Sequence, residues 1–321
     1  MRLTRLRAPA AAAMLAWAYL TGEMPALAQS ADRPSDISQI CDGCVPEKVV
    51  TCKGFLEGAV FDNSGVMWMV GLRSGEIMKI GPGKECLTAG QTNGGPNGAK
   101  FHKDGRLFIA DRARGLIAFD PVAANIKPIH GTYGMENLRG LNDLIFDRAG
   151  GVYFTEPYGS SALNPNGRVF YLPPGPDGRL TLLTDRMAFP NGIALSPDES
   201  RLYVADYATN RIIAFPMQGP GALNVAFPPY VFARLNGGTG PDGMAVDTAG
   251  NLYAAHFNAG EVVVLDPRGF GFGSIRLPPG AGFFTTNIAF HEGYLYITEA
   301  SKNDVWRVKT KIPGNPLYHQ R

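Results

Sequence analysis

Charge of one sign, long apolar runs and nucleotide-binding loops are all scarce in this chain. Thirty Lys and Arg against 28 Asp and Glu leave a formal net charge of only +2. Such a small surplus argues against nucleic acid as a partner. Beyond residue 28, no stretch is apolar over the roughly 20 residues that a membrane span requires. The chain also lacks a Gly-x-Ser-x-Gly elbow and a Walker loop, so serine-hydrolase and nucleoside-triphosphatase chemistry do not fit it.

Glycine and proline, by contrast, are abundant. The 321 residues include 40 Gly and 25 Pro. At this density the two residues interrupt helices and favour short strands joined by tight turns. The composition therefore predicts an all-β protein and argues against long helices and coiled coils.

The amino terminus has the three parts of an export signal. These are a basic start with Arg2, Arg5 and Arg7, an apolar stretch over 8–20, and the small-residue motif Ala26-Leu27-Ala28. The apolar stretch, about 13 residues, is too short for a membrane anchor. We therefore expect residues 1–28 to be a cleaved signal peptide, with Gln29 as the first mature residue. This predicts a periplasmic or secreted protein of near-neutral charge, with no membrane span after cleavage.

Four cysteines lie near the start of the mature chain: Cys41, Cys44, Cys52 and Cys86. In an oxidising compartment an even number favours disulfides, and four cysteines allow three pairings. A redox site at Cys41 and Cys44 is the alternative, but the strand-helix pattern around such sites is missing. A zinc site is a further alternative that lacks a second close pair. We predict structural disulfides without assigning the pairing.

A pattern of three short strands repeats six times along the chain. Each repeat opens with a polar residue and an alternating strand, as in Glu57-Gly58-Ala59-Val60-Phe61, and successive openings lie 40 to 51 residues apart. A second strand such as Arg201–Asp206 and a third such as Gly260–Asp266 follow. With a weaker fourth strand, this is the pattern of a β-propeller blade, and a β-sandwich would not repeat it six times.

The repeat predicts a six-bladed β-propeller with four antiparallel strands per blade. Too few residues follow Lys309 for the last blade to have its own long fourth strand. We therefore expect the segment 29–53 to supply that strand, which closes the ring and covers its edge. Residues 29–321 would then form a single domain.

Equivalent polar residues open the six repeats and should face the propeller axis at one level. They are Glu57, Asn97, Asn142, Asn191, Asp242 and Asn287. Each carries a side-chain oxygen and two are carboxylates, a donor set that suits a hard divalent cation such as calcium. The alternative is that Asn-Gly and Asp-Gly pairs merely form turns. Glu57 and Asn142 are not natural turn residues before Gly58 and Asp143, so we favour the ion.

The same segments resemble the gluconolactonase, senescence-marker-protein (regucalcin) and luciferin-regenerating-enzyme family. The resemblance runs from about Leu56 to Val308 and rests on LEGAVFD at Leu56, GLNDLIFD at Gly140, FPNGIALSPDESRLYVAD at Phe189, GPDGMAVDTAGNLYAAH at Gly240 and TTNIAF at Thr285. It implies a six-bladed propeller with one divalent ion on its axis, usually calcium and in some members zinc or manganese. Many members hydrolyse lactones.

The resemblance also assigns roles to individual residues. Glu57, Asn191 and Asp242 fall on the family's metal ligands, and Asp242 on its proposed general base. Asn142 falls on an asparagine that binds metal in some members and substrate in others. Family lactonases often bind sugar hydroxyls with an arginine two positions before the Asn142 position. This chain has Gly140 there and Arg139 one residue earlier, so the resemblance does not imply a sugar lactone as substrate.

Substrate contacts are expected at Asn142, Arg139, Glu156, Asn287 and Asn97. Glu156 ends a second strand shortly after Asn142. His130 and His256 are weaker candidates for a base, because a lone histidine is more often structural.

These observations predict an exported, metal-dependent hydrolase of lactones or related esters. The ion would polarise the carbonyl, and Asp242 would act as general base, or alternatively as a nucleophile or a ligand only. Two alternatives remain: a non-catalytic secreted propeller that binds a ligand or protein, and phosphotriesterase or strictosidine-synthase-like chemistry on the same scaffold. The sequence does not indicate an oligomeric state.

Overall fold

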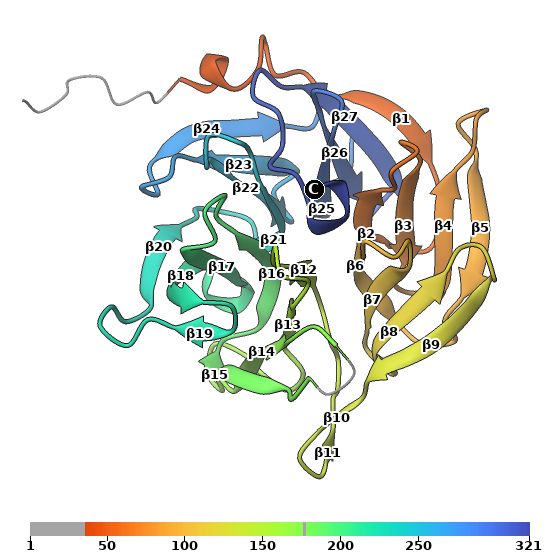
Figure 1. The fold of residues 1–321 in the computed structure, drawn as a ribbon. Coiled ribbons are helices and arrows are strands. Elements are labelled where there is room, and N and C mark those ends of the chain that lie inside the picture. Colours follow the sequence, from red (N-terminus) through yellow and green to blue (C-terminus); the bar gives the residue numbers. More distant parts are fainter. Residues whose placement is uncertain (1–35, 176–177) are drawn as a thin grey trace, which may run out of the picture. The chain divides into compact units, whose positions relative to one another are not determined.

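Six antiparallel sheets stand around a central channel in the computed structural model, which describes residues 36–175 and 178–321 (Figure 1). The predicted signal peptide, 1–28, lies outside the described residues. The prediction of a six-bladed propeller is confirmed. In the part of the chain that is described, no helix is long and apolar enough to cross a membrane.

The strands follow one another from the channel outward in each blade. Blade 1 contains β2 (Leu56–Phe61), β3 (Met67–Gly71), β4 (Glu76–Ile80) and β5 (Cys86–Gln91). Blade 2 contains β6 (Pro96–Phe101), β7 (Leu107–Asp111), β8 (Gly115–Asp120) and β9 (Asn125–His130). Blade 3 contains β12 (Leu144–Phe146), β13 (Val152–Glu156), β14 (Gly167–Leu172) and β15 (Thr181–Met187).

Blade 4 has an extra short strand, β19. It contains β16 (Pro190–Leu195), β17 (Arg201–Asp206), β18 (Arg211–Gly219), β19 (Ala222–Leu223) and β20 (Tyr230–Arg234). Blade 5 contains β21 (Gly240–Val246), β22 (Leu252–Phe257), β23 (Glu261–Leu265) and β24 (Gly271–Arg276). Blade 6 contains β25 (Thr285–His291), β26 (Tyr294–Glu299), β27 (Asp304–Lys309) and β1 (Glu47–Thr51). A hairpin of β10 (Thr132–Tyr133) and β11 (Glu136–Asn137) precedes blade 3.

Apolar side chains fill the spaces between neighbouring blades. Between blades 1 and 2, for example, Trp68 and Ile77 meet Phe101 and Phe119 in one buried cluster. Inner strands such as β2 and β16 are buried along their whole length, whereas the outer strand β9 is largely exposed or half-buried. Burial on both faces explains why the inner strands are mainly apolar apart from the polar repeat position.

The ring is closed by β1, the first strand in the sequence. It pairs antiparallel with β27, the last, with Glu47 opposite Arg307 and Thr51 opposite Asp304. The Arg307 Nε donates to Glu47 Oε1 over 2.6 Å, and the Thr51 hydroxyl donates to Asp304 Oδ1 over 2.6 Å. The predicted closing strand is thus present within the segment 29–53.

All four cysteines form disulfides, as predicted. Cys41 bonds to Cys44, and Cys52 bonds to Cys86. Cys52 follows the closing strand β1 in blade 6, and Cys86 begins the outer strand β5 of blade 1. The second disulfide therefore joins two blades at the closure of the ring. The zinc alternative is not supported, because none of the four thiols is free to bind a metal.

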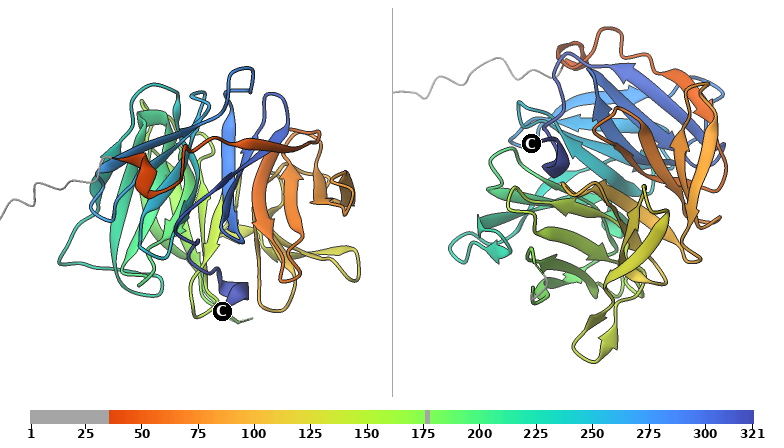
Figure 2. Two further views of the ribbon diagram at one scale, coloured as in Figure 1. Left: turned by 90° about the horizontal axis from the view of Figure 1, so that it is seen from above. Right: turned by 45° about the vertical axis from the view of Figure 1, so that its right-hand side comes forward.

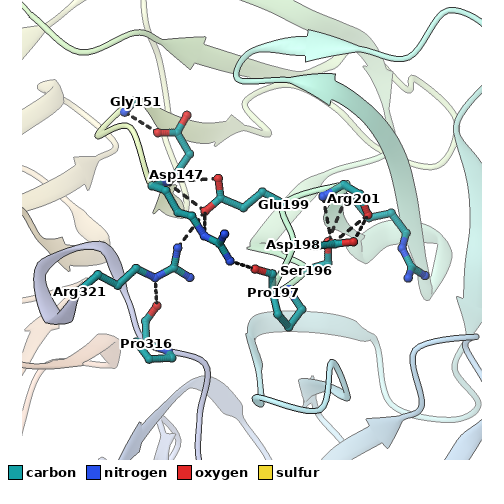
Figure 3. A network of polar contacts seen from close by, with 11 residues as sticks. Asp147, Gly151, Ser196, Pro197, Asp198, Glu199, Arg201, Pro316 and Arg321 are labelled. Atoms are coloured by element: carbon teal, nitrogen blue, oxygen red, sulfur yellow. Dashed lines mark hydrogen bonds and ion pairs between the residues drawn. The ribbon is translucent and has the colours of Figure 1, made fainter.

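The C-terminal segment crosses one end of the channel and contacts several blades (Figure 2). Gly314 forms a β-bridge with Asp247 of blade 5, and the buried His319, in η3 (Tyr318–Gln320), contacts the Phe61 carbonyl through Nε2 at 2.9 Å. Arg321 reaches Glu199 between β16 and β17 over 3.0 Å (Figure 3). A small cavity of about 80 Å³ lies between this segment and the inner strands, so this end of the channel is covered.

Candidate metal and active site

The six polar repeat residues lie on or beside the inner strands, as predicted, and are only 2–5% exposed. Five of the six pairings between first and second strands have an irregular register at the polar residue; these are the pairings of β2, β6, β16, β21 and β25. Such bulges re-aim a side chain out of the sheet. The Glu-Gly, Asn-Gly and Asp-Gly pairs therefore lie within strands, and the alternative that they form connecting turns is wrong.

A glycine follows four of the six polar residues and allows neighbouring inner strands to approach closely. A Cβ on Gly192 would lie 2.1 Å from the Asp242 carbonyl oxygen, and one on Gly98 would lie 2.3 Å from Asp143 Oδ1. Both distances are too short for any side chain. Gly98 N also donates to the Asn142 carbonyl over 2.6 Å. The repeated glycine therefore brings the polar side chains of adjacent blades together around the axis.

Three buried carboxylates share this site. Burial raises the pKa of Glu57, and the charge of Asp143 raises it further, while the Arg112 guanidinium opposes the shift. Burial also raises the pKa of Asp242 well above its ordinary value, and the charges of Glu57 and Asp143 add to the effect. The charged forms of these groups lack the solvation they would have in water. A cation among them would relieve this cost.

Asp143 was not among the predicted site residues. Burial raises its pKa, and Lys100 opposes the shift. The Lys100 Nζ, itself buried, lies 3.9 Å from Asp143 Oδ1. Lys100 thus acts on Asp143 and Arg112 on Glu57, whereas no cationic side chain of the described residues is among the groups that act on Asp242.

Three oxygens of the predicted ligand set have no partner among the described residues. They are Glu57 Oε2, Asn142 Oδ1 and Asn191 Oδ1, and all three are buried. A buried oxygen without a hydrogen bond costs stability unless another group satisfies it. Within 36–175 and 178–321, no three His, Cys, Asp or Glu side chains group as a metal site by themselves. A cation here would thus need amide oxygens as well as carboxylates, which is the donor set of a hard divalent ion.

A cavity of about 450 Å³ opens above these residues. Its lining contains the four predicted metal ligands, Asn97 and the side chains of Phe55, Leu72, Arg73, Arg112, Phe189, Tyr207 and Phe257. This volume is in the range of small-molecule sites. The end of the channel opposite the C-terminal segment therefore combines a polar floor with room for a ligand.

Three residues predicted to contact substrate do not line this cavity: Arg139, Glu156 and Asn287. Asn287 lies on the axis, where its amide hydrogen-bonds the Glu57 carboxylate and its Oδ1 accepts from Ile288 N at 3.0 Å. Glu156 accepts from the Arg139 backbone N–H over 2.6 Å and pairs with the Arg168 guanidinium. The exposed Arg139 lies over the Tyr158 ring at 4.9 Å. Glu156 thus has its oxygens engaged in holding the surrounding chain.

The two histidines considered as bases lie away from the floor of the cavity. His256 is fully buried between Glu261 Oε1 at 3.2 Å and Asn210 Oδ1 at 3.1 Å. His130 ends the outer strand β9. Their positions favour the structural interpretation.

Comparison with known proteins places the chain in a family. The family model described as "SMP-30/Gluconolactonase/LRE-like region" matches residues 54–301. The chain belongs to this family. Lactonase drp35 of Staphylococcus haemolyticus is 33% identical over 231 residues, which is 70% of each chain. The names of such relatives agree with the predicted class of enzyme, a lactone hydrolase.

Solved structures of family members share the fold. A gluconolactonase from Xanthomonas campestris superposes with a TM-score of 0.72 at 24% identity, covering 83% of this chain and 89% of that one. A calcium-binding regucalcin from Agrobacterium tumefaciens gives 0.72 at 20% identity, with 85% and 96% covered. At these identities the likeness establishes the propeller alone.

Sequence reasoning missed several residues of this family member's cavity. Asp143 follows the polar residue of its repeat at the position where most repeats have glycine. This difference is a sequence signal that could have identified it as a site residue. Lys100 is a charge inside an otherwise apolar inner strand, which is a comparable signal. The lining residues Arg73, Arg112, Phe189 and Tyr207 lie at the ends of strands, where the repeat carries no shared residue type.

Proposed function

We propose that the protein is an exported, divalent-metal-dependent hydrolase of lactones or related esters. The observation that carries the proposal is the set of three unpartnered buried oxygens, from Glu57, Asn142 and Asn191, at the floor of a ligand-sized cavity. Family membership and relatives named lactonase and gluconolactonase support the substrate class. The relative named a calcium-binding protein supports calcium as the ion, with zinc and manganese as alternatives.

Glu57, Asn142, Asn191 and Asp242 would hold the ion. A divalent ion bound there would supply Lewis acidity to the ester carbonyl and charge to offset the developing oxyanion. Asn97, at the edge of the same floor, would contact the substrate by hydrogen bonding.

Asp242 would act as the general base and then as the general acid of this reaction. Its carboxylate accepts a proton from water as the water oxygen bonds to the carbonyl carbon. When the bond between that carbon and the ring oxygen breaks, the same proton passes to the leaving alkoxide. The product is a hydroxy acid, and Asp242 returns to its starting form. The aromatic residues Phe189 and Tyr207 at the mouth would limit the access of bulk water.

The ion requirement gives the first prediction. We expect one or more of a panel of aryl, aliphatic and sugar lactones to be hydrolysed, and turnover to fall at least tenfold after chelation and dialysis. Re-addition of calcium, zinc or manganese singly should restore it and identify the ion. Acid release followed with a pH indicator measures this. Unchanged turnover in metal-free protein would exclude the ion from the mechanism, and a metal-loaded protein inactive on the whole panel would favour a binding protein.

Glu57→Gln gives a site-specific control for the same prediction. It keeps the size and one oxygen but removes a charge, so calorimetric titration should show weaker binding of the restoring ion. Glu292→Gln makes the same chemical change on a side chain that is 83% exposed and should bind normally. Equal affinity in the two variants would remove Glu57 from the ligand set.

Export gives the second prediction. The motif at Ala26–Ala28 should direct cleavage before Gln29, so the protein recovered from the periplasm or medium of a bacterial host should begin at Gln29. Amino-terminal sequencing and intact mass measure this. Ala28→Phe, which places a bulky residue at the cleavage site, should yield the uncleaved precursor. Wild-type protein found in the cytosol with residues 1–28 retained would contradict export.

A further inference from the structure

Two guanidinium groups lie on one side of the cavity mouth. Arg73 follows β3 in blade 1, and Arg112 follows β7 in the adjacent blade 2. Their backbones are held alike, because Arg73 N donates to Gly54 O and Arg112 N to Gly95 O, both over 2.9 Å. Both side chains are exposed at the opening. Two neighbouring blades therefore present a positive charge above the carboxylate floor.

These two guanidinium groups form no ion pair and no side-chain hydrogen bond with any residue in 36–175 or 178–321. Other arginines near the strand ends are committed to the fold: Arg211 pairs with Asp206 at 2.7 Å, and Arg114 donates to the Thr92 carbonyl over 2.7 Å. Arg73 lies over the Phe55 ring at 4.7 Å, which orients its guanidinium plane without using its donors. Both groups keep their donors available for a ligand.

The opposite side of the mouth is aromatic. Phe189 and Tyr207 of blade 4 lie 5.3 Å apart between ring centroids, and Phe257 of blade 5 lies 5.9 Å from Tyr207. Phe55 of blade 1 extends this wall at 6.5 Å from Phe257. In the ring of six, blades 4 and 5 stand across the channel from blades 1 and 2 (Figure 1). The mouth therefore has guanidinium groups on blades 1 and 2 and a row of aromatic rings that runs from blade 4 through blade 5 to Phe55, where it meets Arg73.

Two of these rings depend on strained backbone. Phe55 has φ +64° and Phe189 has φ +68°, a left-handed conformation that non-glycine residues rarely adopt. Each precedes an axial ligand, Glu57 or Asn191, by two positions. Such strain is kept where a side chain must occupy a particular place. Gly140, two positions before Asn142 in blade 3, has the same conformation at φ +61°, so blades 1 and 4 keep a phenylalanine where the turn favours glycine.

We infer that the cavity selects lactones that carry a carboxylate and a planar apolar body, with Arg73 and Arg112 as specificity-determining residues. This inference rests on the proposed lactone hydrolysis. The apolar body would stack against Phe189, Tyr207 and Phe257, while the carboxylate accepts hydrogen bonds from the two guanidinium groups. The ester carbonyl between them would then face the axial residues.

A pair of substrates that differ only in charge tests the inference. Dihydrocoumarin carboxylic acid and its carboxamide have nearly the same size and the same lactone ring. In the metal-loaded wild-type protein, kcat/KM for the acid should exceed that for the amide at least tenfold. In Arg73→Gln/Arg112→Gln this ratio should fall to about one. The ratio cancels effects of the substitutions on folding or on the ion, because both substrates meet the same protein.

Arg234→Gln is the matched control. Arg234 is exposed on the outer strand β20 and does not line the cavity, so its loss should leave the acid-to-amide ratio unchanged. A wild-type ratio near one, or a ratio that survives the double substitution, overturns the inference. If Arg234→Gln lowers the acid-to-amide ratio as much as the double substitution does, the preference for the acid comes from the overall charge of the protein, and the inference is likewise overturned.

A binding measurement separates this inference from the proposed function. Chroman carboxylate and chroman carboxamide have no ester and cannot be hydrolysed. Calorimetry should show tighter binding of the carboxylate to the wild type, lost in the double variant, even if no lactone is turned over. Selective binding of the carboxylate without turnover of any lactone would refute the proposed hydrolysis and support the anion site. Turnover of lactones with equal binding of both chromans would support hydrolysis and refute the anion site.

Discussion

Asp242→Asn should lose roughly 10² or more in lactone turnover, a typical contribution of a general base. The substitution keeps a side-chain oxygen where Asp242 can contact an ion, but an amide cannot accept the proton from water. The side chain is buried beside Asn191 and Gly243, so the similar size of asparagine should preserve packing. Turnover and metal content measured on the same sample distinguish the two roles of Asp242.

The outcome that would refute the base assignment is full metal content with turnover near that of the wild type. Asp242 would then be a ligand only. Loss of metal together with turnover would make it a ligand whose charge is essential. Asp185→Asn makes the same chemical change on the exposed outer strand β15 and should affect neither measurement.

Removing the disulfide between blades should produce the largest loss of stability. In the chain-entropy model, a crosslink with a sequence separation of 34 residues, as between Cys52 and Cys86, contributes about 4 kcal/mol. We expect Cys52→Ala/Cys86→Ala to lower Tm by roughly 7 °C. The effect should be strong because Cys52 ends the segment that closes the ring. Thermal unfolding followed by circular dichroism measures it.

The other disulfide provides the comparison. Cys41 and Cys44 are separated by only three positions, and the same model gives their crosslink about 2 kcal/mol. Cys41→Ala/Cys44→Ala should therefore shift Tm about half as far. Equal shifts in the two variants would mean that closure of the ring does not depend on the bond between Cys52 and Cys86.

The sequence predicts the blades well because each blade must satisfy the same packing on both faces. Six inner strands in equivalent surroundings need the same alternation, which makes the repeat visible. The polar position is visible for the same reason, since a buried Glu57 or Asp242 is costly without a purpose. The repeat also predicts the closing strand, because an unpaired β27 would be an exposed edge.

The cavity mouth is less predictable, because it is built from strand ends and turns that differ between blades. Arg112 and Tyr207 follow equivalent second strands, yet the two residues differ in type, so no repeated motif in the sequence marks them as lining one cavity. Glu156 shows the reverse problem. Its nearness to Asn142 in sequence suggests a substrate contact, but its carboxylate is engaged by the Arg139 backbone and by Arg168. The contact with Arg139 depends on the fold of the loop between blades 2 and 3, and the contact with Arg168 depends on the register of β13 and β14.

The pairing of β1 with β27 also determines when the molecule becomes complete. Glu47 and Arg307 are in contact although 260 positions separate them. During synthesis the amino-terminal strand must wait, unpaired, until nearly the whole chain is made. Five blades can assemble from local contacts before that, but closure brings together the most distant segments and incurs the largest loop entropy. The slow step of folding should therefore be the joining of the two ends.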